Sequence, residues 1–223
     1  MALTKVTLTN LALSKIGSDR LQITDFDNDT TIAGSQARLH YDVALDELVR
    51  MHPWACCKKR AKLVNATTTD PKFPLFQYQH AHTLPSDYIR ATYVTNSDSQ
   101  YASIQPRVEW VIEDGFLLTD FEEIWMCYDK RPDPEDMDSL FARAFYTYFA
   151  MKLAVPITGD RDLEVSILKE FDSIIMPEAR RVNGFEKQTM PVVDSEWLES
   201  TIISPSTQSQ SWPPFSQTNY GSF

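Results

Sequence analysis

The chain has 223 residues, a net charge of −10 from 31 acidic and 21 basic side chains, and three cysteines. This length predicts one large domain, or a domain with an appendage, that buries a core without disulfides. Three cysteines, two of them adjacent (Cys56 and Cys57), do not form a disulfide framework and favour a reducing compartment. The acidity argues against a simple nucleic-acid-binding protein, which neutralises phosphates with Lys and Arg, but not against a wall that DNA passes without adhering. No run approaches the about 18 apolar residues of a membrane span.

The first sixty residues carry two helical patterns. Apolar residues at helical spacing predict a short helix over 4–16, which a glycine ends. A long amphipathic helix is predicted from Ile32, with Thr30 or Thr31 as its cap, because a hydroxyl oxygen accepts a backbone N–H there. Pro53 is expected to end or kink this second helix.

The middle of the chain is rich in Thr, Tyr, Val, Ile and Phe, which is typical of strands. An Asp-Gly pair at 114–115 predicts a hairpin turn. The sequence therefore predicts a β-rich insertion. The five predicted strands cover 77–84, 88–95, 101–105, 108–119 and 123–129.

Helical spacing returns at Met137 with a stripe of aromatic residues, interpreted as core, and Pro156 is expected to close this third helix. A fourth helix is predicted from Leu163, and Pro177 leaves its end open. From residue 186 onward we predict no stable element. The last 20 residues lack charge but hold four aromatic residues, which predicts a tail that docks onto a partner. These aromatic residues are Trp212, Phe215, Tyr220 and Phe223.

These elements predict an α+β fold: a helical bundle formed by N- and C-terminal helix pairs, with a β-rich insertion and an extended C-terminal tail. The predicted parts are the N-terminal helices over 1–62, the insertion over 63–130, the C-terminal helices of the same bundle over 131–185, and the docking tail over 186–223.

Common catalytic motifs are absent from the sequence. The six glycines lie far apart, so no phosphate-cradling loop exists, and there is neither a G-x-S-x-G elbow nor an HExxH motif. His80 and His82 would share a strand face and could meet one metal ion with Cys127, but a pair of surface or interface histidines is the favoured interpretation. The adjacent cysteines near His52 suggest a reactive thiol, and a buried, inert cysteine is favoured. We therefore predict no catalytic site, metal or cofactor.

Two local charge clusters stand out. The segment 109–138 holds eleven acids against two basic residues, which leaves a net charge of −9. It is interpreted as a solvated face, as a negative wall that repels DNA, or as an interface that meets a basic neighbouring copy. The basic cluster of 58–62 is either a solvated face or a surface that meets an acidic patch on a neighbouring copy in a head-to-tail ring. The candidate acidic residues are Glu109, Glu113, Asp114, Asp120, Glu122 and Glu123, and the basic ones are Lys58, Lys59, Arg60 and Lys62.

Several short motifs, in their order and spacing, resemble the head-to-tail adaptors of short-tailed bacteriophages (the tail tubular protein A family). The likeness covers residues 3–182. The motifs are N-x-A-L-x-K-I-G at 10–17, H-P-W-A at 52–55, T-L-P-S-D-Y-I-R at 83–90, Y-D-K-R-P-D-P-E-D-M-D at 128–138, and F-A-R-A-F-Y-T-Y-F-A-M-K-L-A at 141–154.

This resemblance implies a structural virion protein with no reaction to catalyse. Such adaptors form a dodecameric ring beneath the portal protein, join it to the tail nozzle protein, and continue the channel through which DNA passes without specific binding. The implied location is the head–tail junction of the virion, after assembly in the bacterial host cytoplasm. Two alternatives stay open: a monomeric binding module that acts through the aromatic tail, and a carboxylate-dependent hydrolase built on the acids of 109–138, which substitution of Glu122, Glu123 and Asp129 by Ala would test.

Overall fold

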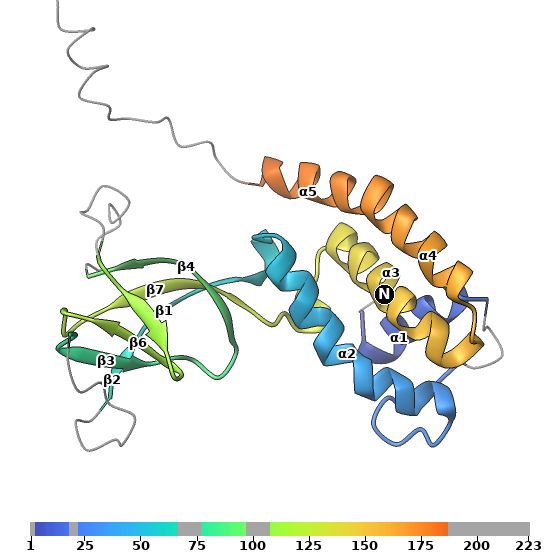
Figure 1. Ribbon diagram of the computed structural model, residues 1–223, viewed down its shortest axis with the longest axis horizontal. Coiled ribbons are helices and arrows are strands. Elements are labelled where there is room, and N and C mark those ends of the chain that lie inside the picture. The colour runs from blue at the N-terminus through green and yellow to red at the C-terminus, as the bar shows by residue number, and fades with distance from the viewer. Residues whose placement is uncertain (1–2, 18–21, 67–76, 97–107, 187–223) are drawn as a thin grey trace, which may run out of the picture. The chain divides into compact units, whose positions relative to one another are not determined.

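The computed structural model describes residues 3–17, 22–66, 77–96 and 108–186, and these form an α+β fold of helices and two antiparallel sheets (Figure 1). The predicted α+β fold class is thereby confirmed. The predicted strand at 101–105 and, apart from Glu186, the predicted tail lie outside the described residues. Among the described helices, none has the length and hydropathy to cross a bilayer.

Two helices precede the strands, as predicted: α1 (Lys5–Lys15) and α2 (Ile32–Met51). Hydroxyl oxygens cap both helices, because Thr4 accepts the backbone N–H of Thr7 and Thr31 accepts that of Gly34. Each cap satisfies one of the backbone donors that the first turn of a helix leaves unpaired. The second helix ends immediately before the His52-Pro53 pair, as its pattern predicts.

Side-chain hydrogen bonds fix the segment between these two helices. Asn10 Nδ2 donates to the carbonyl oxygen of Ile23, and Asn10 Oδ1 accepts the Ile23 N–H, each over 2.9 Å. Arg38 donates to the carbonyl oxygens of Phe26 and Asp29 over 2.9 and 2.8 Å. Backbone groups that have no sheet or helix partner are thereby paired by side chains of α1 and α2.

The first sheet has three strands in the order β1-β7-β4. They are β1 (Lys58–Lys62), β4 (Tyr88–Thr95) and β7 (Trp125–Lys130), and a short 3₁₀ turn at Ala55–Cys57 leads into β1. The predicted boundary at residue 62 therefore differs from the structure, because the strands begin at Lys58. A Lys-Lys-Arg-Ala-Lys segment lacks the apolar alternation by which a strand is recognised.

The second sheet has four strands in the order β2-β3-β6-β5. They are β2 (Val64–Asn65), β3 (His80–Thr83), β5 (Val111–Glu113) and β6 (Phe116–Thr119). The predicted strand at 108–119 is thus a hairpin. Its turn has Asp114 at φ 45° and Gly115 at φ 86°, both left-handed, which is the conformation that a tight hairpin turn requires.

Three helices follow the strands: α3 (Ser139–Thr158), α4 (Arg161–Glu170) and α5 (Met176–Phe185), with a π turn at Phe171–Ile175 between the last two. The prediction that Pro156 closes α3 is wrong. The helix continues to Gly159, whose left-handed conformation (φ 73°) ends it while its N–H bonds to the carbonyl oxygen of Val155. Pro177 occupies the first turn of α5, where a residue without an N–H is tolerated.

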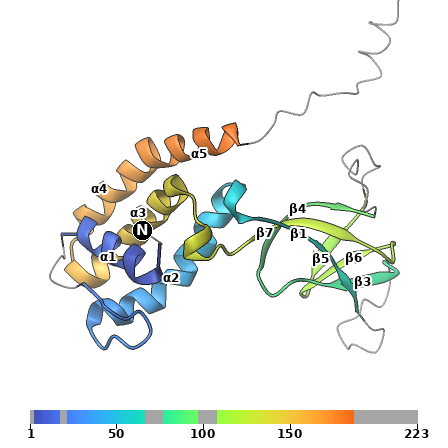
Figure 2. The ribbon, with the colours of Figure 1, turned by 180° about the vertical axis from the view of Figure 1, so that it is seen from behind.

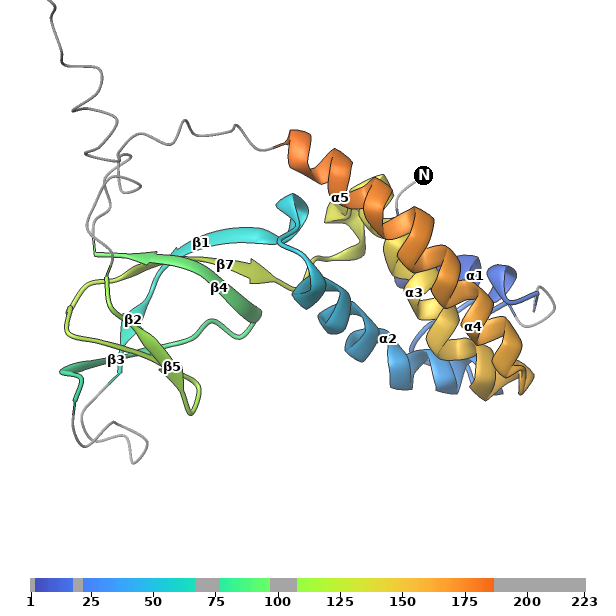
Figure 3. The ribbon, with the colours of Figure 1, turned by 45° about the horizontal axis from the view of Figure 1, so that its top comes forward.

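Helices from before and after the strands share one hydrophobic core. Its centre is a cluster of rings, in which Tyr41 of α2 meets Phe145 and Phe149 of α3 edge-on at 5.0 and 5.5 Å between centroids. The aromatic stripe of α3 is therefore core, as predicted. In Figures 1 and 3, and from behind in Figure 2, α3 lies between α2 on one side and α4 and α5 on the other. A separate core lies between the sheets and includes Leu117 and Tyr128.

The Asn10 contact yields a first prediction. In an Asn10→Asp variant the Nδ2 donor is replaced by an oxygen that faces the Ile23 carbonyl oxygen, so we expect a loss of about 1–3 kcal/mol in the free energy of unfolding at neutral pH. Toward about pH 4 the introduced carboxyl group binds a proton and donates again, which raises its folded pKa, so the deficit shrinks in acid. Urea unfolding at both pH values measures this.

The matched control is Gln22→Glu, which adds the same charge at an exposed position beside Ile23. We expect it to change the free energy of unfolding little at either pH. Equal effects of the two substitutions would show that the Asn10 contact does not fix the segment.

Candidate functional site

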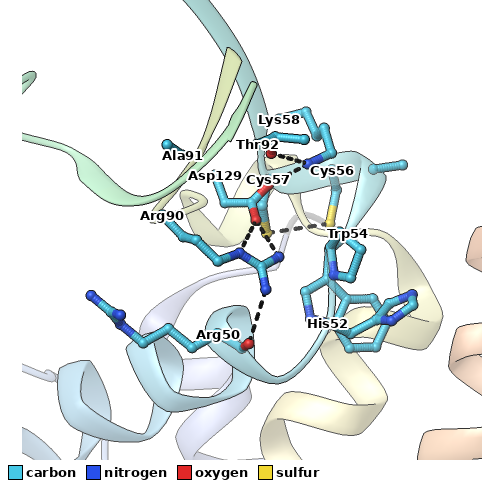
Figure 4. Close-up of polar contacts among 12 residues, drawn as sticks. Arg50, His52, Trp54, Cys56, Cys57, Lys58, Arg90, Ala91, Thr92 and Asp129 are labelled. Carbon is cyan, nitrogen blue, oxygen red and sulfur yellow. Dashed lines mark hydrogen bonds and ion pairs between the residues drawn. The ribbon is translucent and has the colours of Figure 1, made fainter. Parts of the chain in front are cut away.

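A buried carboxylate, Asp129 of β7, lies where strands and helix meet (Figure 4). Its Oδ1 accepts from Lys58 Nζ over 2.7 Å, and its Oδ2 accepts from Arg90 Nε and Nη2 over 3.0 and 2.5 Å. Lys58 and Arg90 are the residues that the strand register places beside Asp129 on β1 and β4. Cross-strand neighbours point to the same face of a sheet, so the register itself brings the three charges together.

The same network reaches the helices. Arg90 Nη1 donates over 3.1 Å to the carbonyl oxygen of Arg50, which belongs to the last turn of α2 and has no partner within that helix's own pattern (Figure 4). Lys58 Nζ also donates to Thr92 Oγ1 over 2.7 Å. One guanidinium therefore connects the central strand of the first sheet with the end of α2.

A second polar network surrounds Asp87, in the Leu-Pro-Ser-Asp turn before β4. Its Oδ2 accepts from Lys59 Nζ over 2.7 Å and its Oδ1 from the Tyr128 hydroxyl over 2.8 Å, and its carbonyl oxygen accepts the Arg131 N–H. Burial acts to raise the pKa of Asp87, but the hydrogen bonds from Lys59 and Tyr128 outweigh it and hold this pKa below its ordinary value. The turn is thereby tied to β1, to β7 and to the connection that follows β7.

A shallow cleft of about 450 Å³ opens beside Asp87. The cations that line it already bind carboxylates: Lys59 binds Asp87, and Arg131 holds Asp46 of α2 with two hydrogen bonds of 2.8 and 2.5 Å. Such a cleft offers a ligand few uncommitted charges. Its clearest chemical role is a further connection between α2 and the segment after β7.

The structure places the four residues of the predicted basic cluster on β1. Lys58, Lys59 and Lys62 each have an acidic partner in the same chain, which for Lys62 is Glu123 at 2.6 Å. Arg60 Nε donates to the Tyr93 hydroxyl over 3.1 Å. Three of the four positive charges therefore have an acidic partner within the chain.

The six candidate acidic residues are all exposed, but they do not lie together. Glu113 and Asp114 are at the β5–β6 turn, whereas Asp120, Glu122 and Glu123 follow the other end of β6. The remaining candidate lies near this second group, because the Glu109 carbonyl oxygen accepts from Thr119 Oγ1. The six candidate acids thus form two groups in space, the last four acids of the stretch 109–138 follow β7, and Asp129 is an internal residue.

The two histidines of the predicted metal candidate differ in burial and in their hydrogen-bond partners. His82 is fully buried, its Nε2 is 3.0 Å from the carbonyl oxygen of Phe121, and its Nδ1 has no partner among the described residues. His80 Nδ1 lies 3.2 Å from Asn65 Nδ2, and the two rings are 6.5 Å apart. Cys127 belongs to the other sheet. Among the described residues, no group of three or more ligating side chains gathers at one point.

The adjacent cysteines form the turn into β1. Cys57 is buried, as the favoured interpretation predicts, and its Sγ is 3.9 Å from that of Cys56. A hydrogen bond from the Cys57 thiol lowers the pKa of Cys56, and the same contact together with burial raises the pKa of Cys57. His52 packs edge-on against Trp54 and its Nε2 lies 2.9 Å from Asn183 Nδ2.

Sequence reasoning missed the residues that hold this junction together. Asn183 of α5 accepts the Ala55 N–H over 2.7 Å and donates to the carbonyl oxygen of Pro53, and Trp54 donates to that of Leu48. One signal was present for Asp129, since it is a charged residue that directly follows four apolar residues of its strand. The tail residues Trp212, Phe215, Tyr220 and Phe223 lie outside the described residues.

Comparison of the sequence with protein-family models and with curated proteins finds no match.

The Asp129 network yields a second prediction. An Asp129→Asn variant keeps the shape of the buried side chain but leaves two partly buried cations without their counter-charge, so we expect a loss of about 3–5 kcal/mol in the free energy of unfolding. The matched control is Glu123→Gln, which removes the exposed partner of Lys62 and is expected to cost within about 1 kcal/mol. Urea unfolding of both variants measures the contrast, and equal losses would refute it.

The Asp87 network yields a third prediction, in pH. A lowered folded pKa means that Asp87 stabilises the protein above the unfolded value of about 3.9, and that this contribution is lost as the pH falls through the folded pKa. An Asp87→Asn variant is therefore less stable at neutral pH, and its stability falls less between about pH 5 and pH 2. Asp133→Asn, an exposed carboxylate lining the same cleft, is the control. Thermal unfolding across this range would contradict the prediction if the Asp87 variant kept the wild-type slope.

Proposed function

We propose that the protein is a structural component of a virion, a head-to-tail adaptor of the kind that its motifs resemble. The observation that carries the proposal is what the polar residues of these motifs do. Arg90 binds the fully enclosed Asp129 and the carbonyl oxygen of Arg50 at the end of α2. Arg131 binds Asp46 of α2, and its N–H donates to the carbonyl oxygen of Asp87. Asp129, one of the acids considered for a hydrolase, is enclosed and holds Lys58 and Arg90, so it is not exposed to a substrate.

The finer description of the fold is part of this proposal. The helices on either side of the strands form one bundle, and the strands form an insertion into it. Two observations support this: α1, α2, α3 and α5 contribute to one core, and the sheets have a core of their own. In an adaptor, the bundle would build the ring and the insertion would reach toward a partner.

The proposed partners are the portal protein, the tail nozzle protein and further copies of this chain, which form a ring at the head–tail junction. DNA passes through the ring without specific binding. The exposed acids at both ends of β6 support this, because like charges repel the phosphate backbone. The proposed number of copies in the ring is twelve, which is what the resemblance implies.

The fourth prediction tests this function. The full chain is mixed with the portal protein encoded by the same short-tailed phage genome. Electron microscopy is then expected to show a second ring stacked on the portal ring. The control is the same mixture with the portal protein replaced by an unrelated ring-forming protein. A chain that stays monomeric and fails to co-sediment with the portal protein would refute the function.

Deletion of 204–223 separates the adaptor from a monomeric binding module. An adaptor retains ring contacts through its helices after this deletion, whereas a module that acts through the aromatic tail loses all binding.

A further inference from the structure

Helix α2 carries apolar residues on the face that points away from the core. Ile32, Leu39 and Val43 are 71%, 64% and 54% exposed, and their spacing of seven and four residues places them in one row along the helix. The residues that α2 buries, among them Tyr41 and Leu48, lie on the opposite side of the helix. Large side chains that are exposed singly are ordinary, but a row of them marks an interaction surface. We call this row the α2 stripe.

A second row runs from the end of the π turn along α5. Ile174 and Phe185 are 56% and 80% exposed, and the exposed Pro177 and Arg181 lie between them at spacings of three and four residues. The buried side of the same helix carries Met176, Ala179 and Asn183. We call this row the α5 stripe.

The two stripes belong to opposite sides of the helical part, because α3 lies between α2 and α5 (Figures 1 and 3). One chain therefore presents two different rows of exposed side chains that it cannot bring together. Two copies can do so head-to-tail, when the α2 stripe of one meets the α5 stripe of the next, and repetition of that contact builds a ring or a filament.

The charges beside the stripes are complementary. On the α2 side, Asp42 and Asp46 share a single cation, Arg131, at 3.4 and 2.5 Å, which leaves one negative charge unbalanced. On the α5 side, Arg180 and Arg181 are exposed and make no ion pair with any residue of the described ranges. Opposite charges beside an apolar contact set its orientation and discourage contacts between like faces.

We infer that the α2 stripe and the α5 stripe form the contact between neighbouring copies of this chain. The contact is heterologous, with Leu39 and Val43 of one copy against Ile174 and Phe185 of the next, and with Arg180 and Arg181 beside Asp42. This inference rests on the proposed function, whose ring it supplies with an interface. It also replaces the basic cluster of β1, whose lysines are already paired, as the surface that joins copies.

The fifth prediction uses two variants, each of which blocks one stripe: Leu39→Asp and Phe185→Asp. Both positions are exposed, so the fold is expected to persist, which circular dichroism checks. In sedimentation velocity at high protein concentration, the wild-type chain is expected to form oligomers. Each variant alone is expected to be monomeric, with association weakened by about tenfold or more, because the contact would bury a charge without a partner.

A mixture of the two variants is the decisive arm. Each variant keeps the stripe that the other has lost, so an equimolar mixture is expected to give dimers and nothing larger. Val64→Asp, on β2 and 73% exposed, is the matched control and is expected to assemble as the wild-type chain does. A compensating pair, Asp42→Arg with Arg181→Glu in one chain, is expected to restore assembly that either substitution alone weakens.

The outcomes separate this inference from the proposed function. Variants that assemble as the wild type does, or a Phe185→Asp chain that forms dimers alone through two α2 stripes, overturn the interface and leave the adaptor function standing. A wild-type chain that stays monomeric overturns the interface as well, and the portal experiment then decides the function independently.

Discussion

The enclosed carboxylate of Asp129 is the interaction on which the arrangement of the strands depends. Without counter-charges a buried carboxylate would be prohibitively costly, so Lys58 and Arg90 have to be adjacent to it. That requirement fixes the neighbours of β7 as β1 and β4, and it fixes their register, since a slip by one residue would turn these side chains to the other face. Arg90 then extends the constraint to α2 through the Arg50 carbonyl oxygen.

The pairing of Asp129 with Lys58 also changes how the two charge clusters of the sequence are interpreted. In the sequence, the negative charge concentrates in 109–138 and the positive charge in 58–62. In the structure, part of each cluster cancels the other, because Lys58 binds Asp129 and Lys62 binds Glu123. The exposed acids that remain lie at the two ends of β6 and in the segment that follows β7. The two clusters of opposite charge in the sequence thus reflect ion pairs within the chain, and they are not in themselves evidence of a contact between chains.

The helices could be predicted from sequence because their signals are local: caps at Thr4 and Thr31, apolar spacing, and a terminal glycine. The strand β1 could not, because it is a lysine-rich segment whose acidic partners lie 28 to 71 residues away in the sequence. The same reason hid the site, since composition cannot tell an enclosed Asp129 from an exposed Glu122. Pro156 misled because a proline near a helix end is tolerated when a left-handed glycine follows and sets the end.

The way the chain enters and leaves the strands explains how two hydrophobic cores coexist in it. Strand β1 begins at Lys58 and strand β7 ends at Lys130, and Lys58 is paired with Asp129. The chain therefore leaves the helices and returns to them at neighbouring points. A segment whose ends are adjacent adds little to the entropic cost of closing the chain around it, and it leaves the packing of the flanking helices undisturbed. The helices can then keep one core, with α3 following the strands and packing on α1 and α2 that precede them. The outward faces of α2 and α5 take no part in either core, so their apolar side chains stay exposed.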